Sequence, residues 1–181
     1  MAYDIENCVV LERISTLQKR LIMTGADLKI VEPQNIHITV RFLGNITTIM
    51  ADKVFNEMKK VRFAPFNIEI NGLGAFPNLR YSRVIWAGIT AGSEQLKSVF
   101  VQLEPRLRDL GFTPDSKGFS PHLTIARVRS GRNKIQLANF ITENGNFRFG
   151  NTRANCLRLK KSSLKPNGPI YSTLKEFCPQ E

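Results

Sequence analysis

The chain of 181 residues carries 26 lysines and arginines against 15 aspartates and glutamates, a formal net charge of +11. Hydrophobic residues make up 42% of it and aromatic residues 9%, which is typical of a folded globular protein and argues against disorder. The apolar runs are too short to cross a bilayer, and the first residues lack the pattern of a secretory signal. We therefore expect a cytoplasmic protein. Its charge favours a polyanionic partner such as nucleic acid, with a merely solubilising basic surface as the alternative.

Hydrophobic periodicity and turn residues predict the elements of the chain. In chain order they are a helix at 8–23, strands at 28–31 and 36–43, a helix from Thr47 or Thr48 to about Val61, strands at 66–73 and 81–90, a helix at 93–111, a strand at 119–128, a helix at 134–143, and strands near 146–149, 155–163 and 170–177. Pro105 lies inside the third helix, so we expect a kink or an interruption there.

The order of elements contains a repeat. Each half of the chain has a helix followed by a strand that contains an H-x-T pattern, and the two histidines are 85 residues apart. We therefore expect a single domain, residues 1–181, made of two pseudo-symmetric lobes that each contribute one strand to a shared cleft. Helices and antiparallel strands mix without a βαβ rhythm, which favours an α+β fold over a doubly wound parallel sheet.

The chain contains two histidines, and each begins the same pattern: His37-Ile38-Thr39-Val40 and His122-Leu123-Thr124-Ile125. In a strand, residues i and i+2 point to the same face, about 6.6 Å apart. Each strand therefore presents one imidazole and one hydroxyl to one surface, while the residues between them face the core. A lone H-x-T pattern is usually structural, and the duplication is what favours catalysis.

This set of groups suits the cleavage of a phosphodiester. A neutral imidazole can take a proton from water while an imidazolium gives one to the leaving oxygen, and hydroxyls with a nearby cation can hold the other oxygens. Histidine serves both purposes because its unperturbed pKa of about 6.5 keeps both forms available near neutral pH. We expect no cofactor and no metal, since two histidines and three scattered cysteines match no zinc spacing and no carboxylate cluster suits magnesium.

The three cysteines are Cys8, Cys156 and Cys178. They cannot all pair within one chain, and none has a CxxC spacing. Reduced thiols are the expectation for a cytoplasmic protein. One internal disulfide is the alternative if the source is a hyperthermophile.

Four blocks of sequence resemble the two-histidine (2H) phosphoesterase superfamily, and within it the RNA 2′,3′-cyclic phosphodiesterases, long called 2′-5′ RNA ligases. They are residues 35–44 with the first motif, 83–88, 121–127 with the second motif, and 164–171. H-x-T alone is weakly specific, whereas four blocks in order over nearly the whole chain are far more so. There is one departure: such proteins usually begin with an apolar strand before the residue that is here Asp4, and this chain has only three residues there.

The resemblance implies a bilobal α+β fold, with two similar lobes of antiparallel sheet and helices around a central cleft. It implies hydrolysis of a terminal 2′,3′-cyclic phosphate to a 2′-phosphate without a cofactor. It also implies that His37 is the proton donor and His122 the acceptor. From their hydroxyls, we expect Thr39 and Thr124 to contact the substrate beside them.

Two arginines near the motifs are further candidates. Arg127 matches the phosphate-contacting arginine of the family, but strand alternation would put it opposite His122. Arg127 can therefore reach the cleft only if the strand has a bulge or ends there. Strand alternation puts Arg41 on the same face as His37, where it is either an RNA contact or a solvated cation at a strand end.

Three other functions stay open. The same site could join a cyclic phosphate to a 5′-hydroxyl without ATP, and a ribonuclease could use two histidines to create cyclic phosphates. A non-catalytic RNA-binding module is the alternative of another class, although the sequence has no RNP-like aromatic pattern and no GXXG loop. The expected partner is RNA with a 2′,3′-cyclic phosphate end, tRNA-derived RNA among the candidates. We expect no membrane contact and a monomer.

Overall fold

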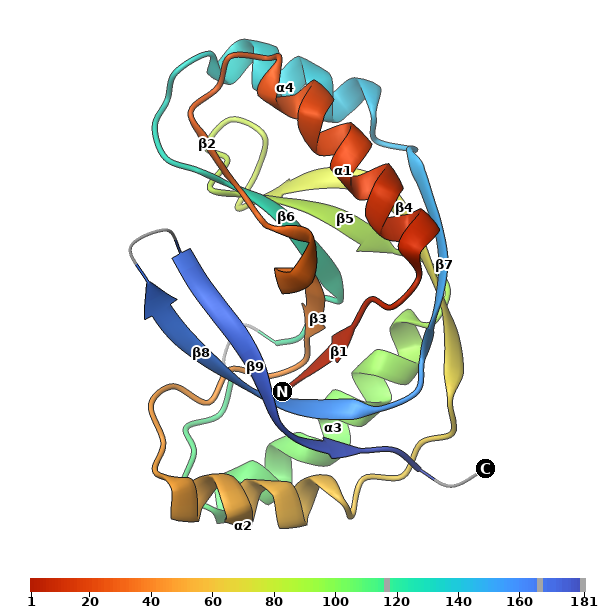
Figure 1. The fold of residues 1–181 in the computed structure, drawn as a ribbon, viewed down its shortest axis with the longest axis vertical. Coiled ribbons are helices and arrows are strands. Elements are labelled where there is room, and N and C mark those ends of the chain that lie inside the picture. The colour runs from red at the N-terminus through yellow and green to blue at the C-terminus, as the bar shows by residue number, and fades with distance from the viewer. Residues whose placement is uncertain (116–117, 166–167, 180–181) are drawn as a thin grey trace.

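The computed structural model describes residues 1–115, 118–165 and 168–179 of the chain (Figure 1). Within them lie four α-helices, one 3-10 turn and nine β-strands, so the expected α+β class is confirmed. In chain order they are β1 (Ala2–Asp4), α1 (Cys8–Ile22), β2 (Leu28–Ile30), the turn Pro33–Asn35, β3 (His37–Thr39), α2 (Thr48–Met58), β4 (Phe66–Phe76), β5 (Val84–Ile89), α3 (Ser93–Asp109), β6 (His122–Val128), α4 (Lys134–Glu143), β7 (Arg148–Ala154), β8 (Leu157–Lys165) and β9 (Gly168–Phe177).

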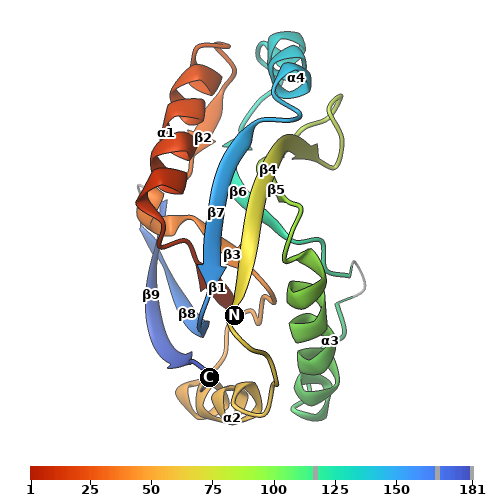
Figure 2. The same cartoon turned by 90° about the vertical axis from the view of Figure 1, so that its right-hand side faces the viewer.

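The nine strands form one curled sheet in the order β7-β4-β5-β6-β3-β1-β8-β9, with β2 also beside β6. Every strand pairing is antiparallel. Helices α1 and α4 pack on the β7-β4-β5-β6 half, and α2 packs on β8 and on α3. Figure 2 shows α3 on the side of the molecule away from α1. The two strands that carry the motifs, β3 and β6, are therefore neighbours in the middle of the sheet, where the two halves meet.

The alternation predicted for the motif strands is confirmed by their burial. Ile38, Leu123 and Ile125 are fully buried and belong to the hydrophobic core. Each histidine and threonine of the motifs is only partly buried. Burial of such apolar side chains stabilises the fold by about 1.5–3 kcal/mol each, so the core fixes which face carries the motifs.

The predicted elements differ from the structure mainly at their ends. The strand expected at 36–43 is only three residues long, because the backbone N–H groups of Val40 and Arg41 both turn to the carbonyl of Met1. Proline has no backbone N–H to donate within a helix, yet helix α3 continues through Pro105 without interruption. The buried side chains of Leu103 and Leu107 hold the helix against the core on both sides of it. The cap at Thr47 is confirmed: its side chain accepts a hydrogen bond from the N–H of Met50.

The short first strand occupies the place beside the first motif. β1 pairs with β3 on one side and with β8 on the other. Tyr3 packs in the core among aromatic rings, with Phe63 and Phe66 about 6 Å away. Three residues therefore suffice to bridge the two halves of the sheet at this position.

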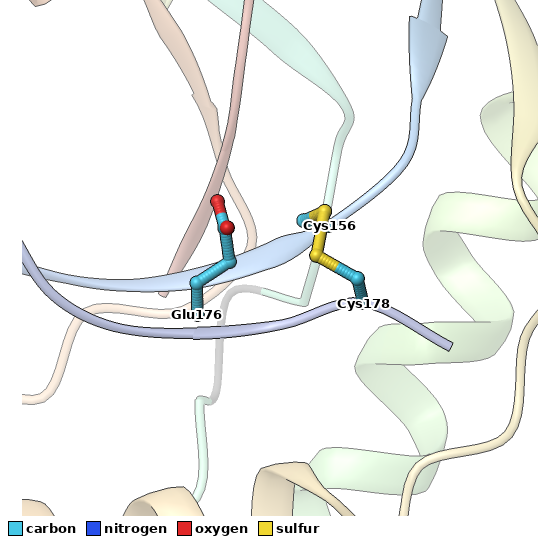
Figure 3. A group of neighbouring side chains, drawn as sticks. All are labelled: Cys156, Glu176 and Cys178. Carbon is cyan, nitrogen blue, oxygen red and sulfur yellow. A yellow bond between two sulfur atoms is a disulfide. The ribbon is translucent and has the colours of Figure 1, made fainter. Parts of the chain in front are cut away.

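Two of the three cysteines are joined, so the expectation of reduced thiols is wrong for them. Cys156, after β7, forms a disulfide with Cys178, after β9, while Cys8 is free and exposed (Figure 3). The carboxylate of Glu176 lies close to this bond. Sulfurs bonded to each other are not thiolates, so these three residues make no metal site in this state.

Two further expectations concern membrane spans and the C-terminal block of the resemblance. No helix in the described residues is long and apolar enough to span a membrane. In the C-terminal block of the resemblance, Pro166 and Asn167 lie outside the described residues.

Candidate active site

The four motif side chains share one face of the paired strands. β3 and β6 run antiparallel with Ile38 opposite Leu123. One residue further in each direction, His37 lies across from Thr124, and Thr39 across from His122. Directly opposite residues on paired strands have Cβ atoms about 4.5–5.5 Å apart, and diagonal neighbours are about 7–8 Å apart. The two imidazoles are such diagonal neighbours, a spacing that accommodates one phosphate group between them. We call these four residues the motif face.

Both imidazoles are held by the same local hydrogen bond. Nδ1 of His37 lies 2.8 Å from the carbonyl oxygen of Asn35, and Nδ1 of His122 lies 2.7 Å from that of Ser120. A carbonyl oxygen can only accept, so each Nδ1 carries the proton and donates it. Each Nε2 is then the unprotonated nitrogen of a neutral ring, available to take up or deliver a proton.

An aromatic ring packs on the side of each imidazole. Tyr171 of β9 lies 4.7 Å from the ring of His37, and Phe76 of β4 lies 5.0 Å from the ring of His122, both edge to face. Phe76 in turn contacts Trp86 at 5.3 Å. The Trp86 ring lies so close to Gly74 that a Cβ there would be 2.2 Å from it. Glycine at 74 therefore provides the space for the rings that support His122.

Burial and nearby cations lower the pKa of both histidines. The pKa of His37 falls to about 4, first because the ring is buried and then because of the charge of Lys160, while the carbonyl of Asn35 and the carboxylate of Asp4 oppose the change. Asp4 lies directly across from His37 in β1 and binds the Lys160 ammonium at 2.5 Å, so that cation is partly compensated. Without a ligand, His37 is therefore neutral at pH 7.

The second histidine has a similar environment with a different cation. The pKa of His122 is lowered by burial first and by Arg127 as well, and the hydrogen bond to the Ser120 carbonyl raises it. Both Nε2 atoms of the motif face thus begin as proton acceptors. A bound anion would favour the protonated form of either ring.

A bulge places Arg127 on the motif face. β5 pairs Ile85 with Ala126 but Trp86 with Thr124, so Ile125 is the extra residue on β6. Ile125 and Ala126 are both buried, and alternation restarts after them, with Arg127 exposed. This is the distortion that the sequence required if Arg127 was to reach the histidines.

The family of LigT-like phosphoesterases matches the chain twice, over residues 9–86 and 89–171. Each match contains one H-x-T strand of the motif face. The chain belongs to the LigT-like phosphoesterase family.

Relatives of this LigT-like phosphoesterase match it over most of its length. A protein of Methanocaldococcus jannaschii is 38% identical over 178 residues, 98% of this chain and 98% of its own. A protein of Aeropyrum pernix is 37% identical over 164 residues, 91% of this chain and 93% of its own. Both are named RNA 2′,3′-cyclic phosphodiesterase.

Solved structures share the fold. E. coli LigT complexed with 3′-AMP superposes with a TM-score of 0.81 at 20% identity, covering 99% of this chain and 96% of that one. A protein of Thermus thermophilus superposes with a TM-score of 0.78 at 24% identity, covering 98% of this chain and 94% of that one. The curled α+β architecture is therefore that of the LigT-like phosphoesterases.

The alternative that Arg41 of this phosphoesterase is a solvated cation at a strand end is wrong. Its guanidinium pairs with Glu104 of α3 at 2.5 Å and donates to the carbonyls of Phe42 and Thr113. Only 11% of the side chain is exposed. Arg41 therefore ties the end of β3 to helix α3.

Sequence reasoning missed several groups around the histidines. The side-chain amide of Asn35 donates to the carbonyl of Pro169 at 3.1 Å, which joins the first motif to β9, where Tyr171 lies. The resemblance included Tyr171 within its last block but gave it no role. No local signal identifies Phe76 or Lys160, because strand pairing brings both to the site from distant parts of the chain.

The motif face does not line either of two hollows on the surface of the described residues. One hollow of about 640 Å³ lies next to β1 and is lined by Asp4, Glu6 and Arg158 among others. Another of about 740 Å³ lies next to the end of β9. Neither is lined by a histidine.

Proposed function

We propose that this protein hydrolyses the terminal 2′,3′-cyclic phosphate of RNA to a 2′-phosphate, with His37 and His122 as acid and base. The observation that carries the proposal is the motif face, where two imidazoles lie diagonally across paired strands and neither Nε2 atom is hydrogen-bonded to another described residue. The names of the relatives, RNA 2′,3′-cyclic phosphodiesterase, support this substrate.

The reaction needs one proton taken and one proton given on opposite sides of phosphorus. Nε2 of His122 removes a proton from water as the water oxygen bonds to phosphorus. The bond between phosphorus and the ribose O3′ breaks, and Nε2–H of His37 gives its proton to O3′. The histidines end the step with their protonation states exchanged, and solvent restores them. The assignment of donor and acceptor follows the family resemblance.

The lowered pKa of His37 has a direct consequence for this scheme. At a pKa of about 4, only about one molecule in a thousand carries the His37 proton at pH 7. The substrate phosphate is an anion, and placed beside the ring it counteracts burial and the charge of Lys160. His37 therefore gains its proton together with the substrate.

The other groups of the site bind the phosphate. The hydroxyls of Thr39 and Thr124 lie across from the histidines and can donate to the non-bridging oxygens. Arg127, brought to the same face by the bulge, supplies positive charge as negative charge develops there. These groups provide the electrostatic stabilisation that a metal ion supplies in other phosphodiesterases, so the scheme uses no metal or cofactor.

We extend the proposal to the setting in which the site works. The substrate is an RNA 3′ end, tRNA-derived RNA included, and a net charge of +11 supports such a partner. The protein acts in the cytoplasm as a monomer. Residues 1–181 form a single domain of two pseudo-symmetric lobes, which the continuous sheet and the two family matches support.

Product analysis tests the proposal. A short RNA with a 2′,3′-cyclic phosphate end should yield a 2′-phosphate end in EDTA and leave internal bonds intact. Cleavage of internal bonds would instead show a ribonuclease. Binding without turnover of folded protein would show an RNA-binding module. A 2′-5′ linkage formed when 5′-hydroxyl RNA is added would show that the same site also joins ends.

A further inference from the structure

Two cations on one side of the motif face are paired with carboxylates. Lys160 of β8 binds Asp4 at 2.5 Å, and Arg158 binds Asp4 and Glu6 at 3.3 and 2.6 Å and also pairs with Glu176. This is the β1-β8-β9 side, next to His37. A polyanion placed there would have to displace these ion pairs.

The opposite side, at the C-terminal end of β6, has cations without such partners. Lys29 of β2 lies across from Arg127, and Arg129 follows directly after the end of β6. Arg80 lies in the loop between β4 and β5. Among the described residues, none of these four side chains forms an ion pair with a carboxylate.

The loop between β4 and β5 adjoins this end of β6. The hairpin closes with Phe76 opposite Val84, and Val84 lies opposite Arg127. The N–H of Val128 donates to the carbonyl of Arg83 at 3.0 Å. The loop thus continues the surface that begins at Arg127. A single acidic residue, Asp27, occurs in the three segments that meet here, 27–29, 80–83 and 127–129.

The same loop presents an exposed aromatic ring. Tyr81 is 60% exposed, and the guanidinium of Arg80 lies 5.4 Å from the centre of its ring. The loop is fixed from within, because the N–H of Tyr81 donates to the side chain of Asn78 at 3.0 Å and the hydroxyl of Ser82 donates to the carbonyl of Asn78 at 3.1 Å. A fixed, exposed aromatic ring beside cations is what unpaired bases stack on.

We propose that Lys29, Arg80, Tyr81, Arg127 and Arg129, here called the β6-end surface, bind the single-stranded RNA that precedes the reacting phosphate. This inference rests on the proposed function, in which the cyclic phosphate is the 3′ end and the rest of the strand lies on its 5′ side. Arg127 lies at the reacting phosphate itself, and Arg129 and the loop with Arg80 and Tyr81 continue the surface away from it. The protein therefore binds the end of a strand more tightly than a free nucleotide.

The experiment compares two substrates in matched variants. The substrates are a nucleoside 2′,3′-cyclic phosphate and an RNA of about six nucleotides with the same end. Arg80→Ala combined with Arg129→Ala removes two charges from the β6-end surface. Lys53→Ala combined with Arg108→Ala removes two exposed charges from α2 and α3 and serves as the control.

The first double variant should lower kcat/KM for the RNA at least tenfold and leave that for the nucleotide within twofold. Its log–log salt dependence for RNA should be shallower by about 1.4, since each phosphate contact on a single strand contributes about 0.7. Tyr81→Ala should lower RNA turnover at least fivefold, and Tyr81→Phe should retain it because the ring is kept. The control should change neither substrate by more than twofold.

Two outcomes would overturn the inference: an equal loss for both substrates, or an RNA loss as large in the control. Fluorescence anisotropy with a six-nucleotide RNA ending in a 3′-phosphate separates the inference from the proposed function. If wild-type protein turns over nothing but binds this RNA, and only the Arg80/Arg129 variant loses binding, the surface stands and the proposed function fails. If turnover is normal and the Arg80/Arg129 variant binds as tightly as wild type, the surface fails alone.

Discussion

The partly buried, neutral state of His37 makes the stability of the fold depend on pH. Its pKa is about 4 in the folded chain and about 6.5 when unfolded and hydrated. As the pH falls below about 6.5, the unfolded chain takes up a proton that the folded chain does not, so the free energy of unfolding decreases. The contribution is fully present above pH 6.5 and is lost progressively down to pH 4.

The size of the effect follows from the two pKa values. Between about pH 7.5 and pH 5, His37 alone should lower the free energy of unfolding by about 2 kcal/mol. A variant that cannot titrate, His37→Gln, should lose that part of the pH dependence and keep the part due to His122 and the carboxylates.

Urea unfolding of wild type and His37→Gln at several pH values measures the difference. Imidazole NMR gives a direct second reading, because the chain has only two histidines and their signals are easily assigned. It should show His37 protonated on Nδ1, with a pKa near 4 in the folded chain. A folded-state pKa near 6.5, or equal pH dependence in both proteins, would refute the reasoning.

Three further changes test the surroundings of the site. Arg127→Ala should lower kcat/KM by about a hundredfold, with partial recovery in Arg127→Lys; an unchanged rate would exclude it from the phosphate site. Gly74→Ala should displace the Trp86 ring and cost about 1–3 kcal/mol of stability, measured by urea unfolding, together with a shift of the His122 NMR signal; wild-type values for both would contradict the packing argument. Cys156→Ser opens a bridge with a sequence separation of 22 and should cost about 3 kcal/mol, or about 6–12 °C in Tm by calorimetry, while Cys8→Ser should change little; equal Tm values would show that the bridge contributes nothing.

The faces of the motif strands could be predicted from the sequence because strand alternation is a local rule. Ile38 and Leu123 had to be buried if His37 and His122 were to share the accessible face, and they are. The duplication, one histidine in each half, further indicated that the two strands would lie together. The pairing of β3 with β6 agrees with that expectation.

The rest of the site depends on contacts between distant parts of the chain, which local patterns do not encode. The bulge at Ile125 appears only in the pairing of β6 with β5. Phe76 and Tyr171 reach the histidines because β4 and β9 lie where the sheet order puts them. Arg41 looked like a strand-end cation because its partner, Glu104, is 63 residues away. The pairing of Cys156 with Cys178 is likewise invisible until β8 and β9 are known to be adjacent.

The most direct test of the two-histidine account is the hydrolysis of a nucleoside 2′,3′-cyclic phosphate in EDTA by wild type, His37→Ala and His122→Ala. The account predicts that wild type makes the 2′-phosphate, and that each variant remains folded but loses at least about a hundredfold in rate. A folded variant that retains turnover within tenfold of wild type, or a wild-type activity that EDTA abolishes, would contradict it.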